Sequence, residues 1–214
     1  MNKVTQYNIF LGRTASLTIL SGTALLIMAS GRLAHAITVF GAMMWVNILS
    51  ALTAHTGARV FPRRGRVVLL AFLTSFFAGI FLLVLWMLSP LCALESFFAV
   101  SVIPMFCMVS GIYKQLETLT LKDTLLTSFS ETVIFGLLII ILALIREPLG
   151  YLSLSLPGGT RGIVLLFSLT TESFLPIHLI AASCGALLLI GYFMGLFRYI
   201  KEKYPLVTGG KNDA

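Results

Sequence analysis

Cys107 is the residue whose chemistry is hardest to reconcile with its apolar surroundings. It follows Pro104 by three positions in the stretch FFAVSVIPMFCMVSG. Proline removes a backbone hydrogen bond and kinks or ends a helix, and backbone groups freed inside a membrane must face protein or water. A thiolate at such a break could ligate a soft metal or an iron–sulfur cluster. The alternative interpretation is a small buried apolar residue, which free cysteine commonly is.

A second candidate for chemistry is the adjacent pair Arg146 and Glu147, which stands where an apolar run stops. Ionisable side chains at membrane depth are costly and tend to be functional. At the end of a helix, however, the same side chains can reach the lipid headgroups. The following Pro148 predicts that the helix ends here. Both interpretations of the pair, functional and interfacial, are therefore open at this point.

The composition places these residues in an integral membrane protein. The 214 residues are 58% hydrophobic and 11% charged, whereas soluble domains carry roughly 25% charged residues. The mean hydropathy is +0.99. We interpret the net charge of +7 as loop charge that sets the topology, so the expected surroundings are a lipid bilayer and not a nucleic acid.

Six apolar runs predict six transmembrane helices in an all-α fold, which forms a single domain over residues 1–214. The runs cover residues 14–30, 34–53, 67–88, 92–113, 129–145 and 175–197. Six crossings put nearly all lysines and arginines on one side of the membrane, and only Arg32, Arg146 and Arg161 on the other. Because positive loops stay in the cytoplasm, both termini and the 198–214 tail are expected there.

A weak internal repeat relates the two halves of the chain, about 14–88 and 92–197. The second and fifth runs share TVFG and TVIFG, and the first and fourth end in MASG and MVSG. Three crossings per half make the halves inverted relative to each other. We expect the first and fourth runs to be half-helices, because interrupted segments at matching places mark a site near the membrane midplane.

Two connecting segments are also interpreted from their composition. Residues 114–128 are amphipathic and are expected to lie at the membrane interface. Residues 151–174 are rich in Gly, Ser and Pro and contain an apolar patch too short to span the membrane, which is typical of a connection or a re-entrant loop. The chain has no Walker loop, no GxGxxG and no His/Glu zinc pattern, so an enzyme acting alone is not indicated.

Several stretches resemble the membrane proteins of two ion-translocating complexes, Rnf and the Na⁺-translocating NADH:quinone oxidoreductase (Nqr). The stretches are IPMFCMVSG, SFSETVIFG, IREPLGYLSL and SCGALLLIGYFMG. The likeness extends over residues 14–200 and is nearest to the E-type membrane protein of Rnf and the D-type membrane protein of Nqr. It implies a bacterial inner-membrane protein with six helices in two inverted halves, which pairs with a paralogous subunit of opposite orientation.

The resemblance also implies a cofactor and a function. Each paired subunit of the family gives two cysteines to a shared [2Fe–2S] cluster, through which electrons cross the membrane while Na⁺ or H⁺ is moved. Cys107 matches one of the two ligand positions. At the other position, which the family marks with Leu-Gly-x-Cys-Pro, this chain has Thr23. Thr is not a usual cluster ligand, so the chain departs from the family pattern at the cofactor.

Three functions are therefore compatible with the sequence. The first is an electron-transferring subunit of an Rnf/Nqr-like complex, which other membrane and peripheral subunits would accompany. The second is a small stand-alone transporter, for which Asn47, Thr23 and Ser101 would have to form a polar cluster at the midplane. The third is a structural subunit of the complex without a cofactor, which the replacement at Thr23 would explain.

Overall fold

The protein is a bundle of apolar helices with one short β-hairpin, seen here in a computed structural model that describes residues 15–57, 66–109, 121–158, 162–168 and 178–203. The helices are α2 (Ala15–Ala29), α3 (Leu33–Gly57), α4 (Arg66–Leu88), α5 (Pro90–Val109), α7 (Leu121–Tyr151), α8 (His178–Ala181) and α9 (Ser183–Lys203). The strands are β1 (Ser153–Pro157) and β2 (Ile163–Ser168), which pair antiparallel.

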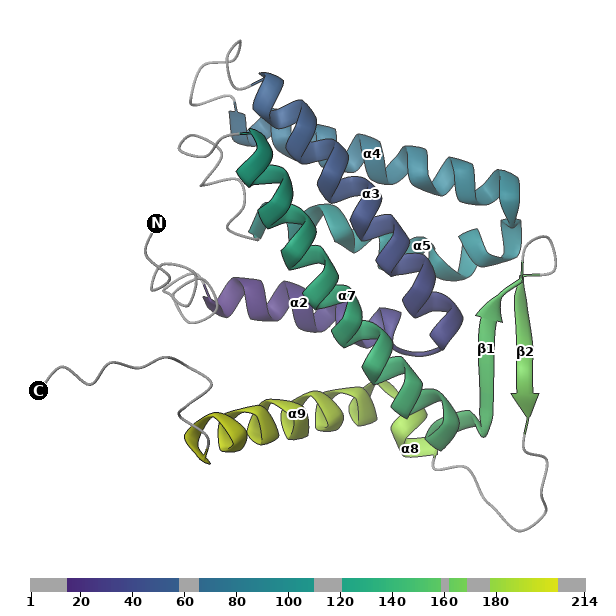
Figure 1. The fold of residues 1–214 in the computed structure, drawn as a ribbon. Helices are drawn as coiled ribbons and strands as arrows, with labels where there is room; N and C mark the ends of the chain where they lie inside the picture. Colours follow the sequence, from purple (N-terminus) through teal and green to yellow (C-terminus); the bar gives the residue numbers. More distant parts are fainter. Residues whose placement is uncertain (1–14, 58–65, 110–120, 159–161, 169–177, 204–214) are drawn as a thin grey trace, which may run out of the picture.

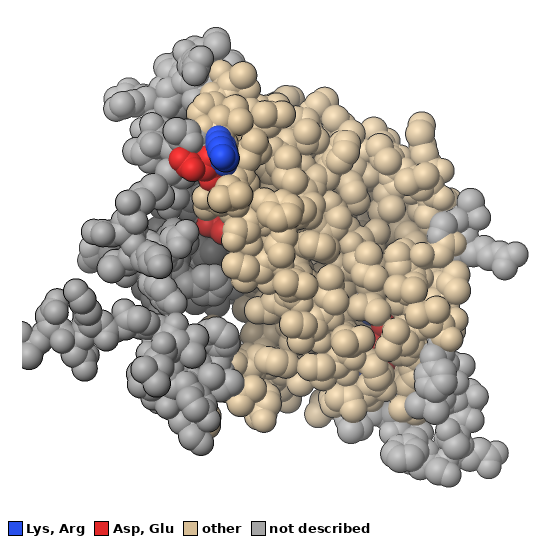
Figure 2. Space-filling model, viewed as in Figure 1, with Lys and Arg blue, Asp and Glu red and all other residues tan. Residues whose placement is uncertain are grey.

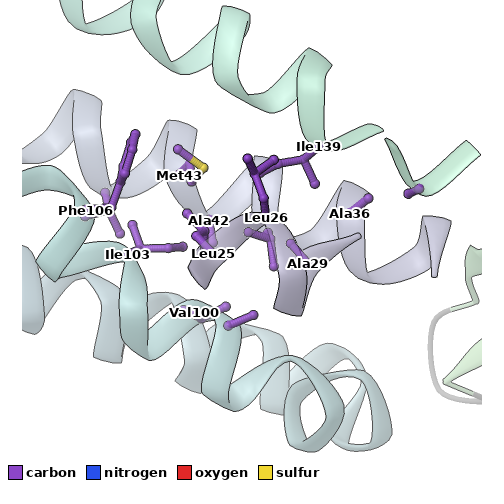
Figure 3. Close-up of a cluster of buried hydrophobic side chains, with 14 of the residues drawn as sticks. Leu25, Leu26, Ala29, Ala36, Ala42, Met43, Val100, Ile103, Phe106 and Ile139 are labelled. Carbon is purple, nitrogen blue, oxygen red and sulfur yellow. The ribbon is translucent and has the colours of Figure 1, made fainter. Parts of the chain in front are cut away.

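Helix α3 stands at the centre of the bundle, packed against α4, α5 and α7 (Figure 1). Helix α5 also packs against α2 and α4, whereas α9 contacts α2 and α8. The buried core lies where α2, α3, α5 and α7 meet, and its side chains are aliphatic apart from the sulfur-containing Met43 and Cys107 and the ring of Phe106 (Figure 3). The labelled core residues are Leu25, Leu26, Ala29, Ala36, Ala42, Met43, Val100, Ile103, Phe106 and Ile139.

Four of the described helices, α3, α4, α5 and α7, are long and apolar enough to cross a membrane. Their outward faces carry large apolar side chains such as Phe72, Leu83 and Phe98. Among the described residues on the face in Figure 2, few Lys, Arg, Asp or Glu side chains are visible, and most of them lie toward the left of the view. The protein is therefore a membrane-embedded helical protein, as predicted. Helix α2 has 15 residues and the apolar part of α9, Ser183–Leu196, is shorter than a full span.

The fifth helix is longer than the sequence indicated. We expected a helix over 129–145 that would end at Pro148, after an interfacial segment. Instead α7 contains Pro148 and runs for 31 residues, or about 46 Å, which exceeds a hydrocarbon core of about 30 Å. It stops at Leu152, whose φ is 49°. Residues 121–128 thus belong to this helix, and 114–120 lie outside the described residues.

Two further expectations are corrected by the fold. Pro104 was predicted to break the fourth run, but α5 continues through it to Val109. Residues 151–174 were interpreted as a connection or re-entrant loop, but 153–168 contain the β1–β2 hairpin, so the fold is not purely α-helical. The hairpin follows α7 directly and packs against α3. It therefore covers the end of the bundle at which α7 stops.

Candidate functional site

Cys107 lies in the core, where it takes part in a chain of hydrogen bonds that joins three helices. Its side chain is fully buried, and its thiol donates to Asn47 Oδ1 at 2.8 Å. The Nδ2 group of Asn47 donates in turn to Thr132 Oγ1 at 2.7 Å. The Thr132 hydroxyl donates to the carbonyl oxygen of Ser128 at 2.7 Å. This Cys107 network ties α5 to α3 and α3 to α7 through polar contacts inside an otherwise apolar core.

The sequence did not predict this network. Asn47 joins α3 to α7 through its bond to Thr132, as polar side chains between membrane helices commonly do. The contact between Asn47 and Cys107 was missed, because the two residues are 60 positions apart. No local pattern reports a pair at such a separation. Cys92 is buried and Cys184 is exposed, and both are free cysteines.

Arg146 is a buried residue of α7 whose side chain binds the ends of two other helices. Its relative exposure is 4%, so the guanidinium does not extend to the lipid headgroups, and the interfacial interpretation of Arg146 is wrong. Its three nitrogen atoms donate five hydrogen bonds of 2.6–3.1 Å. The acceptors are the carbonyl oxygens of Ile27, Ile180, Ala181 and Ala182 and the hydroxyl of Ser30.

These acceptors explain why a guanidinium is found at this depth. The last carbonyls of a helix have no partner within the helix, and the C-terminal end of a helix attracts a positive charge. Ile27 lies in the last turn of α2, and Ile180 and Ala181 lie in α8. Arg146 thus satisfies carbonyls at two helix ends and brings a favourable charge to them. Its forked geometry allows both groups to be reached at once.

Glu147 performs the complementary function at the start of a third helix. Its side chain is 1% exposed, and Oε2 accepts a hydrogen bond of 2.7 Å from the backbone N–H of Leu33, the first residue of α3. A carboxylate at a helix N-terminus is favoured by the helix dipole. The other oxygen, Oε1, has no hydrogen-bond partner among the described residues. Glu147 therefore does not extend to the headgroups either.

Together Arg146 and Glu147 form a junction, which we call the helix-end clamp. It holds the C-terminal end of α2, the N-terminal end of α3 and the short helix α8 around α7. Gly150 contributes by its small size, since a Cβ atom there would come within 2.9 Å of the Ala181 side chain. The hydrogen bonds of the clamp go to backbone groups of the chain itself and to the Ser30 hydroxyl. These contacts position helix ends.

Thr23 and Pro104 lie near the Cys107 network without completing a ligand set. Thr23 is half-buried on α2. Its neighbour Gly22 packs against Phe106 and Phe135, whose rings stack 4.5 Å apart. Because Phe106 precedes Cys107, the turn of α2 that carries Thr23 faces the turn of α5 that carries Cys107. Pro104 lies one turn before Cys107 on the same helix.

The donor set in the described part of the chain does not fit a [2Fe–2S] cluster. A cluster takes four ligands, usually thiolates, and two paired subunits would each have to supply two. Around Cys107 the described residues contain no group of three or more His, Cys, Asp or Glu side chains that could hold a metal. Thr23 stands at the position where the resemblance implies the second cysteine, and the Cys107 thiol donates to the amide oxygen of Asn47. Cys107 alone is half of the required pair.

Comparison of the chain with models of known protein families, and with curated proteins, found no match.

Proposed function

We propose that this chain is a membrane subunit of an electron-transfer complex similar to Rnf and Nqr. The observation that carries the proposal is the helix-end clamp. The IREPLG stretch is one of the motifs on which the resemblance rests, and its Arg146 and Glu147 make the most extensive buried polar contacts of the candidate site. A motif that resembles this family thus contains the two residues, Arg146 and Glu147, that join helix ends in this protein.

The proposal includes the topology and the partners expected from the sequence. The chain crosses the bacterial inner membrane six times, in two inverted halves, with both termini in the cytoplasm. It pairs with a paralogous membrane subunit of opposite orientation, and flavin- and iron–sulfur-bearing subunits complete the complex. The complex couples electron flow to the movement of Na⁺ or H⁺. A contact between α2 and α5, the two predicted half-helices, is compatible with this arrangement.

A structural role within the same complex is a second candidate, and the Cys107 network favours it. The thiol is hydrogen-bonded to Asn47, and Thr23 stands at the other ligand position. A cluster, when bound in such a subunit, supplies one-electron transfer. The residues of this chain supply at most one thiolate to it, so we derive no electron-transfer step through Cys107. What the chain itself supplies is a rigid, correctly oriented surface for its paralogous partner.

A stand-alone transporter is less compatible with the geometry. That function required a polar cluster of Asn47, Thr23 and Ser101. The Ser101 hydroxyl instead donates to the carbonyl of Phe97 in its own helix, and the residue is exposed on the outside of α5. Asn47 is engaged with Cys107 and Thr132. The three residues therefore do not assemble into a substrate site.

Deletion of the gene for this chain tests the proposal in the cell. If the chain is a subunit of the complex, flavin- and iron–sulfur-bearing partners should lose their attachment to the membrane in the deletion strain. Re-expression of the wild-type chain should restore it. Membrane-bound flavoprotein and iron–sulfur content that is the same with and without the chain would contradict the proposal.

A further inference from the structure

Helices α3 and α7 pack antiparallel in a regular register along much of their length (Figure 1). The N–H of Leu33 meets Glu147, and the Phe40 ring lies where a side chain at Gly136 would be. Further along, Asn47 bonds to Thr132. From one pair to the next, the residue number rises along α3 and falls along α7. The register can therefore be followed toward the end of the bundle where α3 stops and α7 begins.

Polar side chains continue along this contact beyond Asn47 and Thr132. One helical turn farther, this register places Ser50 on α3 opposite Ser128 on α7, and both residues are fully buried. One turn beyond Ser128, Thr124 on α7 is also buried. Side chains three or four positions apart share a helix face, so these residues form one line. We call this line the polar seam; it consists of Asn47, Ser50, Thr124, Ser128 and Thr132.

Two buried polar atoms of the polar seam have no hydrogen-bond partner among the described residues. They are Ser50 Oγ and Ser128 Oγ. A hydroxyl in a helix commonly bonds to the carbonyl one turn before, and Thr53 and Thr132 do so in these same helices. The two serines do not. Buried polar groups are almost always paired with protein or with ordered water.

We propose that the polar seam binds ordered water molecules, which connect the membrane face where α3 ends and α7 begins to the thiol of Cys107. A buried water needs two to four polar partners. The hydroxyls of Ser50 and Ser128, which the register places opposite each other, supply two, and the two serines lie one turn from the Asn47–Thr132 pair to which the Cys107 thiol is bonded. This inference goes beyond the proposed function and holds whether or not the chain assembles with electron carriers.

The inference has a direct chemical consequence at the thiol. Water in the polar seam exchanges with the solvent and lies beside the Asn47–Thr132 pair, so the proton of the Cys107 thiol should exchange with deuterium through a water molecule that contacts the thiol. A thiol sealed in an apolar core exchanges only when the structure opens. The S–H stretching vibration, which moves to the S–D position on exchange, reports this process in the intact protein within membranes or detergent.

The first test compares two buried positions on the same helix. Ser50→Cys and Val46→Cys are made in a chain whose native cysteines are replaced by alanine. Ser50 and Val46 are both 0% exposed and lie one turn apart on α3. After transfer to deuterated buffer, the thiol at position 50 should exchange at least about tenfold faster than the thiol at position 46. Equal exchange rates would overturn the proposal.

The second test removes the hydroxyls and reads the native thiol. With Cys92 and Cys184 replaced by alanine, Cys107 is the sole source of the S–H signal. Apolar cavities stay dry, so Ser50→Ala combined with Ser128→Ala should slow exchange at Cys107 by about tenfold or more. Ser101→Ala, which removes an exposed hydroxyl of α5, should leave the rate unchanged. Exchange as fast in the double variant as in the parent would contradict a water line held by these serines.

Discussion

The carboxylate of Glu147 accepts a hydrogen bond of 2.7 Å from the backbone N–H of Leu33, which lies 114 residues earlier in the chain. This bond fixes the start of α3 to the end of α7. Arg146, the preceding residue, fixes the end of α2 and the end of α8 to the same helix. The clamp therefore determines how the helix ends at this side of the bundle are placed.

Removal of the Glu147 carboxylate should destabilise the protein. Glu147→Ala leaves the buried N–H of Leu33 without its partner, and a hydrogen bond to a charged group contributes about 1.5–3 kcal/mol. Glu147→Gln keeps an acceptor oxygen and should lose less stability. The measurement is the midpoint of thermal unfolding in detergent for the three proteins. Unfolding of Glu147→Ala at the wild-type temperature would show that the bond does not hold α3.

Replacement of Arg146 by lysine should be costly although the charge is kept. Lysine presents one compact ammonium group, which cannot reach carbonyls of α2 and α8 together. We expect a loss of about 2 kcal/mol or more in the free energy of unfolding. Arg32→Lys is the matched control, because Arg32 is partly exposed and stacks over the Tyr151 ring at 5.6 Å. Equal losses of unfolding free energy in the two variants would argue against a specific role for the forked guanidinium of Arg146.

A double-mutant cycle should detect the bond between Asn47 and Thr132. Asn47→Leu removes the donor to the Thr132 hydroxyl, and Thr132→Val leaves the Nδ2 group of Asn47 without its acceptor, whereas the double variant removes both groups. Hydrogen bonds between membrane helices have coupling energies of about 0.6 kcal/mol on average and about 1.7 kcal/mol at most. We expect a favourable coupling in this range from unfolding measurements. Strictly additive effects of the two substitutions would mean that the bond contributes nothing.

The contact of α3 with α7 also predicts a difference between two glycines. A Cβ atom at Gly136 would overlap the Phe40 ring, whereas a Cβ at Gly79 meets no atom within 4 Å. Gly136→Ala should therefore lower the unfolding temperature. Gly79→Ala should leave it unchanged or raise it, because alanine is favoured over glycine in helices by about 0.5–1 kcal/mol. If both variants unfold at the same temperature, α3 and α7 do not pack this closely.

The donor set at Cys107 predicts the outcome of substitution in the assembled complex. If the complex carries a [2Fe–2S] cluster, Cys107→Ser should leave the intensity of its electron paramagnetic resonance signal unchanged, because Thr23 deprives this chain of the second ligand. Cys92→Ser is the control for general effects of losing a thiol. Loss of the signal in Cys107→Ser alone would assign the residue as a ligand.

The four long helices α3, α4, α5 and α7 could be predicted from the sequence because long apolar runs have few alternatives in a membrane. The hairpin at 153–168 was missed, although YLSLSLP alternates apolar and polar residues as a strand does. The neighbouring glycines made a loop the simpler interpretation. Pro148 was given too much weight as a stop signal, because α7 continues through it to Tyr151.

The site residues were partly predictable, but their partners were not. Arg146 and Glu147 stood out as charges at membrane depth, and Cys107 as a thiol beside a proline. Their contacts with Ile27, Leu33 and Asn47 join residues that are 60–119 positions apart. Such pairs depend on how the helices pack. Sequence spacing reports only neighbours on one helix or strand.

The most direct test of the proposed function is purification of the chain from the membranes of its own cells, with a tag at the C-terminus and mild detergent. We predict that a paralogous membrane subunit is recovered in equal amount, together with subunits that show flavin absorbance and iron–sulfur content. The Arg146→Lys chain should recover less of these partners from the same quantity of membrane. Recovery of the wild-type chain alone, or only with copies of itself, would contradict the proposal that it is a subunit of an Rnf/Nqr-like complex.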